Sequence, residues 1–237
     1  RRWQQAPLHG VRRVVVARGE SEELLVPTLP SHGAANRMTS PPIAVLYRDA
    51  DVAVVDKPSG IVVHRSDMAR ERDVAMMRAR DTLGAHVWPV HRLDRQTSGA
   101  LAFALSEDSV RALRAAWDDG RVKKTYVAIV RGSTPDHAII DYAIPKSEDG
   151  PKVEAITELW TLARGEWASL IVASPRTGRY HQIRRHMAHL RHPLANDSNY
   201  GTGWFNRKVR EAFGLKRMAL HAHTLTLPNV GTIVAPL

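Results

Sequence analysis

The sequence predicts an α+β fold in which helices flank a mixed, mainly antiparallel β-sheet. Runs rich in β-branched residues recur from residue 43 onward, as the strands of a sheet require. Helix-like segments are few and do not alternate regularly with these runs, which disfavours a doubly wound sheet. Apolar residues make up 43% of the 237-residue chain, an ordinary proportion for a globular core.

Seven segments are predicted to be strands because apolar and β-branched residues gather in runs of strand length. They are IAVLY (43–47), VAVVDK (52–57), ALAFALS (100–106), KTYVAIV (124–130), VEAITELWTLA (153–163), ASLIVAS (168–174) and LHAHTLTL (220–227). Lys57, Pro58 and Gly60 mark a tight turn after the second run, and we interpret them as mainly structural.

One helix is predicted over EDSVRALRAAWDDG (107–120). Val110, Leu113 and Trp117 stand at i, i+3 and i+7, with Ser106 as the N-cap and Gly120 as the stop signal.

Two further helices are predicted from weaker patterns, over 181–190 and 207–217. In the first, Ile183, Met187 and Leu190 form one apolar stripe, while Arg184 and Arg185 lie off it and give a basic polar face. The second predicted helix is also basic. A solvent-exposed helix face accounts for its charged residues as well as contact with RNA does.

The two ends of the chain show fewer strand and helix patterns than the middle does. Residues 1–40 are rich in turn and breaker chemistry, so we expect an N-terminal extension outside the core, with a single catalytic domain over 41–237. The sequence stops soon after a strand-like run without a cap, so we expect the domain to be cut short at its C-terminal end.

Charge and composition restrict the function. With 34 Lys and Arg against 24 Asp and Glu, the net charge is +10, which favours a polyanionic partner, above all nucleic acid. Cysteine is absent, which excludes disulfides and thiol chemistry and fits a cytoplasmic location. No apolar run approaches the roughly 20 residues that span a bilayer, so we expect no membrane partner. We also expect a monomer.

The segment VHRLDRQTSGALAFAL (90–105) carries the strongest functional signal. Asp94 stands between arginines in a polar turn that leads directly into an apolar strand. A sheet can hold such a carboxylate rigidly, and neighbouring cations keep it ionised as a nucleophile or base. Gly99 permits a positive φ or the close approach of a ligand. A structural ion pair with Arg92 or Arg95 is the alternative.

The nine residues from His91 to Gly99 match every fixed position of HRLDxxTSG, the signature of the RluA family of pseudouridine synthases, and the chain resembles that family. The resemblance extends through VVDKPSGIVVH (54–64), KKTYVAIVRG (123–132) and TGRYHQIRRHMAHLRHPLANDSNYG (177–201), and covers almost all of 43–227. HQIRRHMAHLRHP and LHAHTL are most similar to the TruC-type, tRNA-modifying branch. The resemblance implies a pseudouridine-synthase-like fold and isomerisation of a uridine in tRNA, uridine 65 near the acceptor and T-stem.

The resemblance also implies residue roles. Asp94 is the catalytic carboxylate, which adds to C1′ or removes the 2′ proton, and the sequence does not choose between these. Tyr126 stacks on the flipped uracil, although a core aromatic is the alternative from the residue alone. Arg184 pairs with Asp94, where a phosphate-facing or solvated arginine is the alternative. Arg92 fills the gap that the flipped base leaves.

The remaining polar residues are assigned to RNA binding. His91, Arg92, Arg179, His181 and Arg185 are predicted RNA contacts. The last three belong to residues 176–192, which contain no acid, and the histidines can donate to phosphate or backbone. The histidines of HQIRRHMAH invite a metal site, but arginines crowd each candidate, so we predict no metal. Isomerisation without a redox step requires no cofactor, and we predict none.

Two alternative functions are consistent with part of these observations. A synthase acting on ribosomal RNA shares the chemistry, and an RNA-binding module without activity shares the charge. The sequence departs from the branch at Gln96, where proline is frequent, and at Asn196, where glycine is usual. We expect both departures to affect loop rigidity or substrate choice rather than activity.

Overall fold

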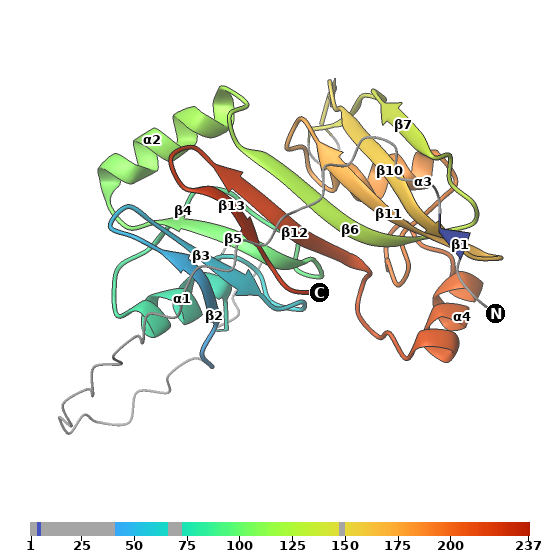
Figure 1. Cartoon of the computed structure of the whole chain (residues 1–237), viewed down its shortest axis with the longest axis horizontal. Helices are drawn as coiled ribbons and strands as arrows, with labels where there is room; N and C mark the ends of the chain where they lie inside the picture. The colour runs from blue at the N-terminus through green and yellow to red at the C-terminus, as the bar shows by residue number, and fades with distance from the viewer. Residues whose placement is uncertain (1–3, 6–40, 66–72, 147–149) are drawn as a thin grey trace.

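The computed structural model describes residues 4–5, 41–65, 73–146 and 150–237. Within these ranges, eleven strands form one sheet (Figure 1). Its main path runs β1 (Gln4–Gln5), β10 (Thr157–Arg164), β11 (Ala168–Pro175), β6 (Lys123–Arg131), β12 (Leu220–Leu227), β5 (Ser98–Ala104), β3 (Val52–Lys57) and β2 (Ala44–Arg48). Beside this path, β13 (Gly231–Val234) pairs with β12, β4 (Trp88–Pro89) with β5 and β7 (His137–Ile140) with β10. A separate pair is formed by β8 (Ile144–Pro145) and β9 (Lys152–Val153).

The pairing between β12 and β5 joins the two halves of the sheet. It is parallel, with His221 opposite Ser98 and Ala222 opposite Gly99, whereas the other pairings between the described strands are antiparallel. The predicted mixed, mainly antiparallel sheet is therefore confirmed.

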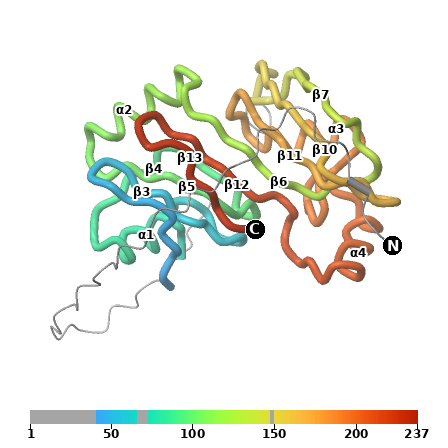
Figure 2. Tube along the Cα trace, viewed as in Figure 1, coloured from blue at the N-terminus to red at the C-terminus, as the bar shows by residue number. Residues whose placement is uncertain are grey.

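Four helices lie outside the sheet in the described part of the chain: α1 (Ala75–Leu83), α2 (Glu107–Asp118), α3 (Gln182–His189) and α4 (Gly203–Phe213). The first two accompany the half that contains β2, β3 and β5, and the last two accompany the half that contains β10 and β11 (Figure 1 and Figure 2). The side chain of Ser106 accepts the N–H of Ser109, so the predicted N-cap of α2 is confirmed.

Some predicted boundaries were wrong. The helix predicted over 207–217 begins at Gly203 and ends at Phe213, because Gly214 takes a left-handed conformation (φ 64°) and its N–H bonds back to Arg210. The strand predicted over 153–163 is divided between β9 and β10. Helix α1 was not predicted from the sequence. The predicted extension over 1–40 lies outside the described residues, apart from Gln4–Gln5.

The central strand β5 is buried along its whole length and packs on both of its faces. Leu101 and Phe103 belong to one apolar cluster, while Ala100 and Ala102 belong to another, as alternation along a strand requires. The turn that precedes β5 is therefore attached to a fixed element. None of the described helices is long and apolar enough to cross a bilayer.

Candidate active site

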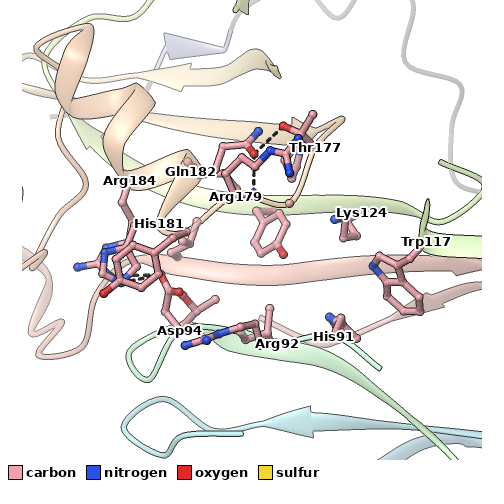
Figure 3. Close-up of a pocket in the computed structure, with 18 of the residues that line it drawn as sticks. His91, Arg92, Asp94, Trp117, Lys124, Thr177, Arg179, His181, Gln182 and Arg184 are labelled. Carbon is pink, nitrogen blue, oxygen red and sulfur yellow. Dashed lines mark hydrogen bonds and ion pairs between the residues drawn. The ribbon is translucent and has the colours of Figure 1, made fainter. Parts of the chain in front are cut away.

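Asp94 lies in the turn between β4 and β5 and lines a cleft (Figure 3). The N–H of Thr97 donates to the carbonyl of Asp94 at 3.1 Å and closes the turn. The cleft has a volume of about 760 Å³, which is ample for a nucleotide base.

Gly99 allows the Asp94 turn to lead directly into β5 where β5 pairs with β12. Its φ is 109°, and a Cβ at this position would lie 2.3 Å from the carbonyl oxygen of Ala222 on β12. Only glycine allows the two backbones to approach this closely. Beside it, the Ser98 hydroxyl and Nδ1 of His221 lie 2.9 Å apart in a buried hydrogen bond. The parallel β5–β12 contact thus sets the position of the Asp94 turn.

Lys57 also holds the Asp94 turn in place. This lysine is fully buried, and its Nζ donates to the carbonyls of Pro58 (2.9 Å), Ile61 (2.8 Å) and Arg95 (3.2 Å). Burial lowers the pKa of Lys57 to about 7, and the nearby charge of Asp94 partly opposes this shift. The N–H of Gly60 also donates to the Arg95 carbonyl, at 2.8 Å. A residue interpreted as part of a turn therefore also anchors the loop that carries Asp94.

Arg184 brings Asp94 together with a second acid. Its Nη1 donates to Oδ2 of Asp94 at 3.2 Å, while Nε and Nη2 donate to the two carboxylate oxygens of Asp197 at 2.8 and 2.9 Å. Arg184 is 4% exposed. The basic polar face expected for α3 is therefore incomplete, because Arg184 is turned inward and neutralised by carboxylates.

Asp197 was not among the predicted site residues. It is 1% exposed, and the backbone N–H groups of Asn199 and Tyr200 donate to its Oδ1 at 2.9 and 3.1 Å. Burial opposes its ionisation, but the hydrogen bonds and charge of Arg184 outweigh burial and lower the pKa of Asp197. The available signal was its position, as the first acid after the acid-free segment 176–192.

Tyr126 lies on β6 and lines the same cleft as Asp94. It is 9% exposed. Burial, followed by the negative charge of Asp94, raises the pKa of its phenol. Tyr126 therefore presents a neutral phenol at physiological pH.

Two predicted RNA contacts, His91 and His181, are enclosed in the site as neutral rings. Nε2 of His91 accepts the N–H of Ala102 at 2.9 Å, and burial lowers the pKa of His91 to about 3. Nε2 of His181 lies 3.8 Å from Oδ2 of Asp94, and burial lowers its pKa to about 4. Neither ring carries a positive charge for a phosphate at neutral pH.

The three predicted arginine contacts have different environments. Arg92 and Arg179 are exposed and line the cleft, and Nε of Arg179 donates to the carbonyl of Glu154 at 3.0 Å. Arg185 is absent from the lining residues; it donates to the carbonyl of Pro145 at 3.1 Å and to the hydroxyl of Tyr200 at 2.9 Å. The structure thus gathers every predicted site residue except Arg185 around one cleft.

Comparison with known proteins identifies the family. A sequence model of the family described as RNA pseudouridylate synthase matches residues 51–189. The chain belongs to this family. It is 40% identical over 207 residues to the tRNA pseudouridine synthase C of Yersinia pestis, covering 78% of this chain and 80% of the relative. It is 39% identical over 210 residues to the protein of the same name from Haemophilus ducreyi, covering 80% and 86%.

Solved structures agree with the assignment. Human RNA pseudouridylate synthase domain containing 1 superposes with a TM-score of 0.69 at 25% identity and covers 86% of each chain. Human RNA pseudouridylate synthase domain containing 4 gives 0.67 at 24% identity, covering 82% of this chain and 88% of the human protein, and supports the fold alone. The predicted RluA resemblance, the fold and the class of enzyme, an isomerase, are confirmed.

The histidines of α3 in this pseudouridine synthase have packing partners. His186 is fully buried, with Nδ1 2.9 Å from Oγ1 of Thr157 and Nε2 2.8 Å from the carbonyl of Tyr142. The ring of His189 stacks on Tyr142, with the centroids 3.7 Å apart. Among the described residues, no group of three or more His, Cys, Asp or Glu side chains is arranged to hold a metal ion.

The synthase also accommodates its unusual Asn196. This residue has φ 58°, a left-handed conformation that favours glycine and that asparagine tolerates. Its Nδ2 donates to the carbonyls of Leu215 (2.7 Å) and Arg217 (3.1 Å). The amide therefore adds two hydrogen bonds next to Asp197 that glycine could not make.

Proposed function

We propose that this pseudouridine synthase modifies a uridine in tRNA, with Asp94 as its catalytic carboxylate. The observation that carries the proposal is the meeting of Asp94, Arg184 and Tyr126 in one cleft. The curated relatives reported above are named for tRNA, and the chain spans four fifths or more of each. These names support tRNA as the substrate.

The proposed reaction breaks the N1–C1′ bond of uridine and rejoins the base to C1′ through C5. Asp94 either adds to C1′ or removes the 2′ proton. Arg184 aims the Asp94 carboxylate by a charge-assisted hydrogen bond, because its other two donors are fixed on Asp197. Tyr126, as a neutral phenol, contributes a stacking surface and a hydroxyl hydrogen bond rather than a phenolate base.

RNA binding is assigned to the cationic residues of the cleft. Arg92 is exposed next to the Asp94 turn, where it can fill the space of the extruded nucleotide, and Arg179 can reach a phosphate. His91 and His181 are neutral, so their proposed contacts are hydrogen bonds or ring contacts. Arg185 lies outside the cleft lining, and its guanidinium donates to the Pro145 carbonyl and to the Tyr200 hydroxyl. Its proposed contribution to RNA binding is to hold these two groups in position.

We further propose that the catalytic domain spans 41–237, that the protein works as a monomer in the cytoplasm, and that its target is uridine 65, near the acceptor and T-stem. The target uridine rests on the resemblance to the tRNA-modifying branch, and the domain bounds rest on the extent of the strand-like runs from residue 43 onward.

The substrate is tested by pseudouridine mapping with carbodiimide labelling and primer extension. Unmodified tRNA transcripts and ribosomal RNA fragments are incubated with wild-type protein under identical conditions. We expect one enzyme-dependent stop in tRNA, in the acceptor or T-arm region. A stop confined to ribosomal RNA would retain the chemistry and overturn the proposed substrate.

A further inference from the structure

Lys124 is an ammonium inside the cleft that the reaction described above does not use. It stands two residues before Tyr126 on β6, so both side chains project from the same face of the strand, and both line the cleft. Figure 3 shows Lys124 on the side of the cleft away from Arg184, near Trp117. The neighbouring Lys123 is exposed and donates to the carbonyl of Gly120 at 2.8 Å.

The ammonium reaches into the cleft rather than out to water. Its Nζ lies 3.8 Å from the position that a Cβ on Gly178 would occupy, and Gly178 also lines the cleft. Burial lowers the pKa of Lys124. Within the described part of the chain, Nζ has no hydrogen-bond or ion-pair partner. A partly buried cation without a partner is costly unless a ligand supplies one.

The surroundings indicate what that ligand is. His91, whose pKa is lowered by burial and by the charge of Lys124, is neutral. Asp94 is the one carboxylate among the lining residues, and Arg184 already holds it. A phosphate of the RNA backbone reaches Arg92 and Arg179 more readily than it reaches Lys124, because both arginines are exposed and Lys124 is partly buried on β6. The group that enters the cleft is the flipped base.

We propose that Lys124 donates to a carbonyl oxygen of the target uracil and stabilises the negative charge of the detached base. This inference rests on the proposed function of the cleft. When N1–C1′ breaks, its electron pair stays on the base and is delocalised over N1, O2 and O4. When C5 bonds to C1′, the Asp94 carboxylate leaves C1′ or returns the 2′ proton. The C5 proton is then lost and N1 gains one, so atoms and charge balance. A donor aimed at the oxygen where charge develops accelerates such a step.

The first test compares Lys124→Met with Lys123→Met, which removes an equal charge one residue away. Single-turnover conversion and RNA binding are measured separately, and thermal unfolding checks the fold. We expect Lys124→Met to slow conversion about 100-fold, as loss of one preorganised donor does, with little change in Kd. Lys123→Met should convert at close to the wild-type rate. Lys124→Arg should recover part of the loss.

The second test locates the contact by replacing one oxygen of the base. Transcripts carry 2-thiouridine or 4-thiouridine at the target position, because sulfur accepts a hydrogen bond less well than oxygen. Each is reacted with wild-type protein and with Lys124→Met. We expect one of the two substitutions to slow the wild-type enzyme while having a much smaller effect on the variant. Such non-additivity assigns the contact to that oxygen.

Three results would overturn the proposal in distinguishable ways. Wild-type rates in Lys124→Met, or additive effects at both oxygens, would reject the base contact while wild-type conversion upholds the proposed function. A weaker Kd with a reduced salt dependence and an unchanged rate would assign Lys124 to a backbone phosphate instead. Failure of the wild-type protein to convert any uridine would overturn the proposed function, and this inference with it.

Discussion

Arg184 shows what a motif predicts and what it omits. The HQIR segment predicts that this arginine pairs with Asp94, and the structure places Nη1 3.2 Å from that carboxylate. The motif says nothing of Asp197, whose bidentate contact holds the guanidinium in place. The position of Asp197 as the first acid after segment 176–192 was a signal in the sequence. Its burial against Arg184 depends on long-range packing, so that contact was found only in the structure.

We predict that Arg184→Lys reduces turnover about 100-fold although the charge is retained. A lysine ammonium cannot make the planar fork to Asp197 and also reach Asp94. Single-turnover kinetics at saturating RNA provide the measurement. Arg78→Lys is the matched control, because Arg78 makes a similar fork to Asp73 outside the lining of the cleft, and we expect its rate to stay within a few-fold of wild type. Equal rates in the two variants would contradict the role of Arg184.

The lowered pKa of His91 makes the stability of the protein depend on pH. In the unfolded chain its pKa is near 6.5, whereas burial lowers it to about 3 in the folded protein. The unfolded state therefore binds more protons between these values, and the free energy of unfolding falls as pH falls through this window.

The slope from this one group is at most about 1.4 kcal/mol per pH unit. Urea unfolding of wild type and His91→Gln between pH 4 and pH 7 measures it, since glutamine can accept the Ala102 N–H without titrating. We expect a shallower slope in the variant. Parallel slopes would show that the folded His91 binds protons normally.

At the scale of elements, the turn before β5 and the turn after β3 act as one unit. The sequence identifies both turns by their glycine, proline and polar residues, but it does not show that Lys57 joins them through the carbonyl of Arg95. Gly99 was expected to allow a positive φ or close approach by a ligand. The structure shows the positive φ, and the approaching group is the backbone of β12.

Gly99→Ala is therefore predicted to destabilise the protein by at least about 3 kcal/mol, because the methyl group would overlap the backbone of Ala222. Gly84→Ala is the control. Gly84 also has a positive φ, 61°, but nothing lies within 4 Å of its Cβ position, so we expect a cost of about 1 to 2 kcal/mol. Chemical denaturation measures both. A similar cost for the two variants would argue against the close β5–β12 approach.

The errors in element boundaries have local causes. The helix expected to extend to Arg217 stops at Gly214, which was inside the expected range and was not treated as a terminator. In contrast, α2 was predicted closely because its cap, its apolar stripe and its stop signal agree with one another. Agreement among independent local signals separates the correct boundaries from the wrong ones.

At the scale of the whole molecule, the cleft brings together side chains from distant parts of the chain. Asp94, Tyr126 and Arg184 come from the β5 turn, from β6 and from α3, and the central β5–β12 pairing joins segments more than 120 residues apart. Charge and motifs predicted a basic pseudouridine synthase from the sequence. The order of the strands could not be predicted, because pairing between distant segments leaves no periodic signal in either one.

The central claim is that Asp94 performs the chemistry in this cleft. It is tested most directly by single-turnover pseudouridine formation with wild type and Asp94→Asn, alongside binding of the same labelled tRNA. We predict that the variant forms no detectable product while its Kd stays within about 3-fold of wild type, because the carboxylate is lost and the cationic lining is kept. A wild-type rate of product formation in Asp94→Asn would contradict the account.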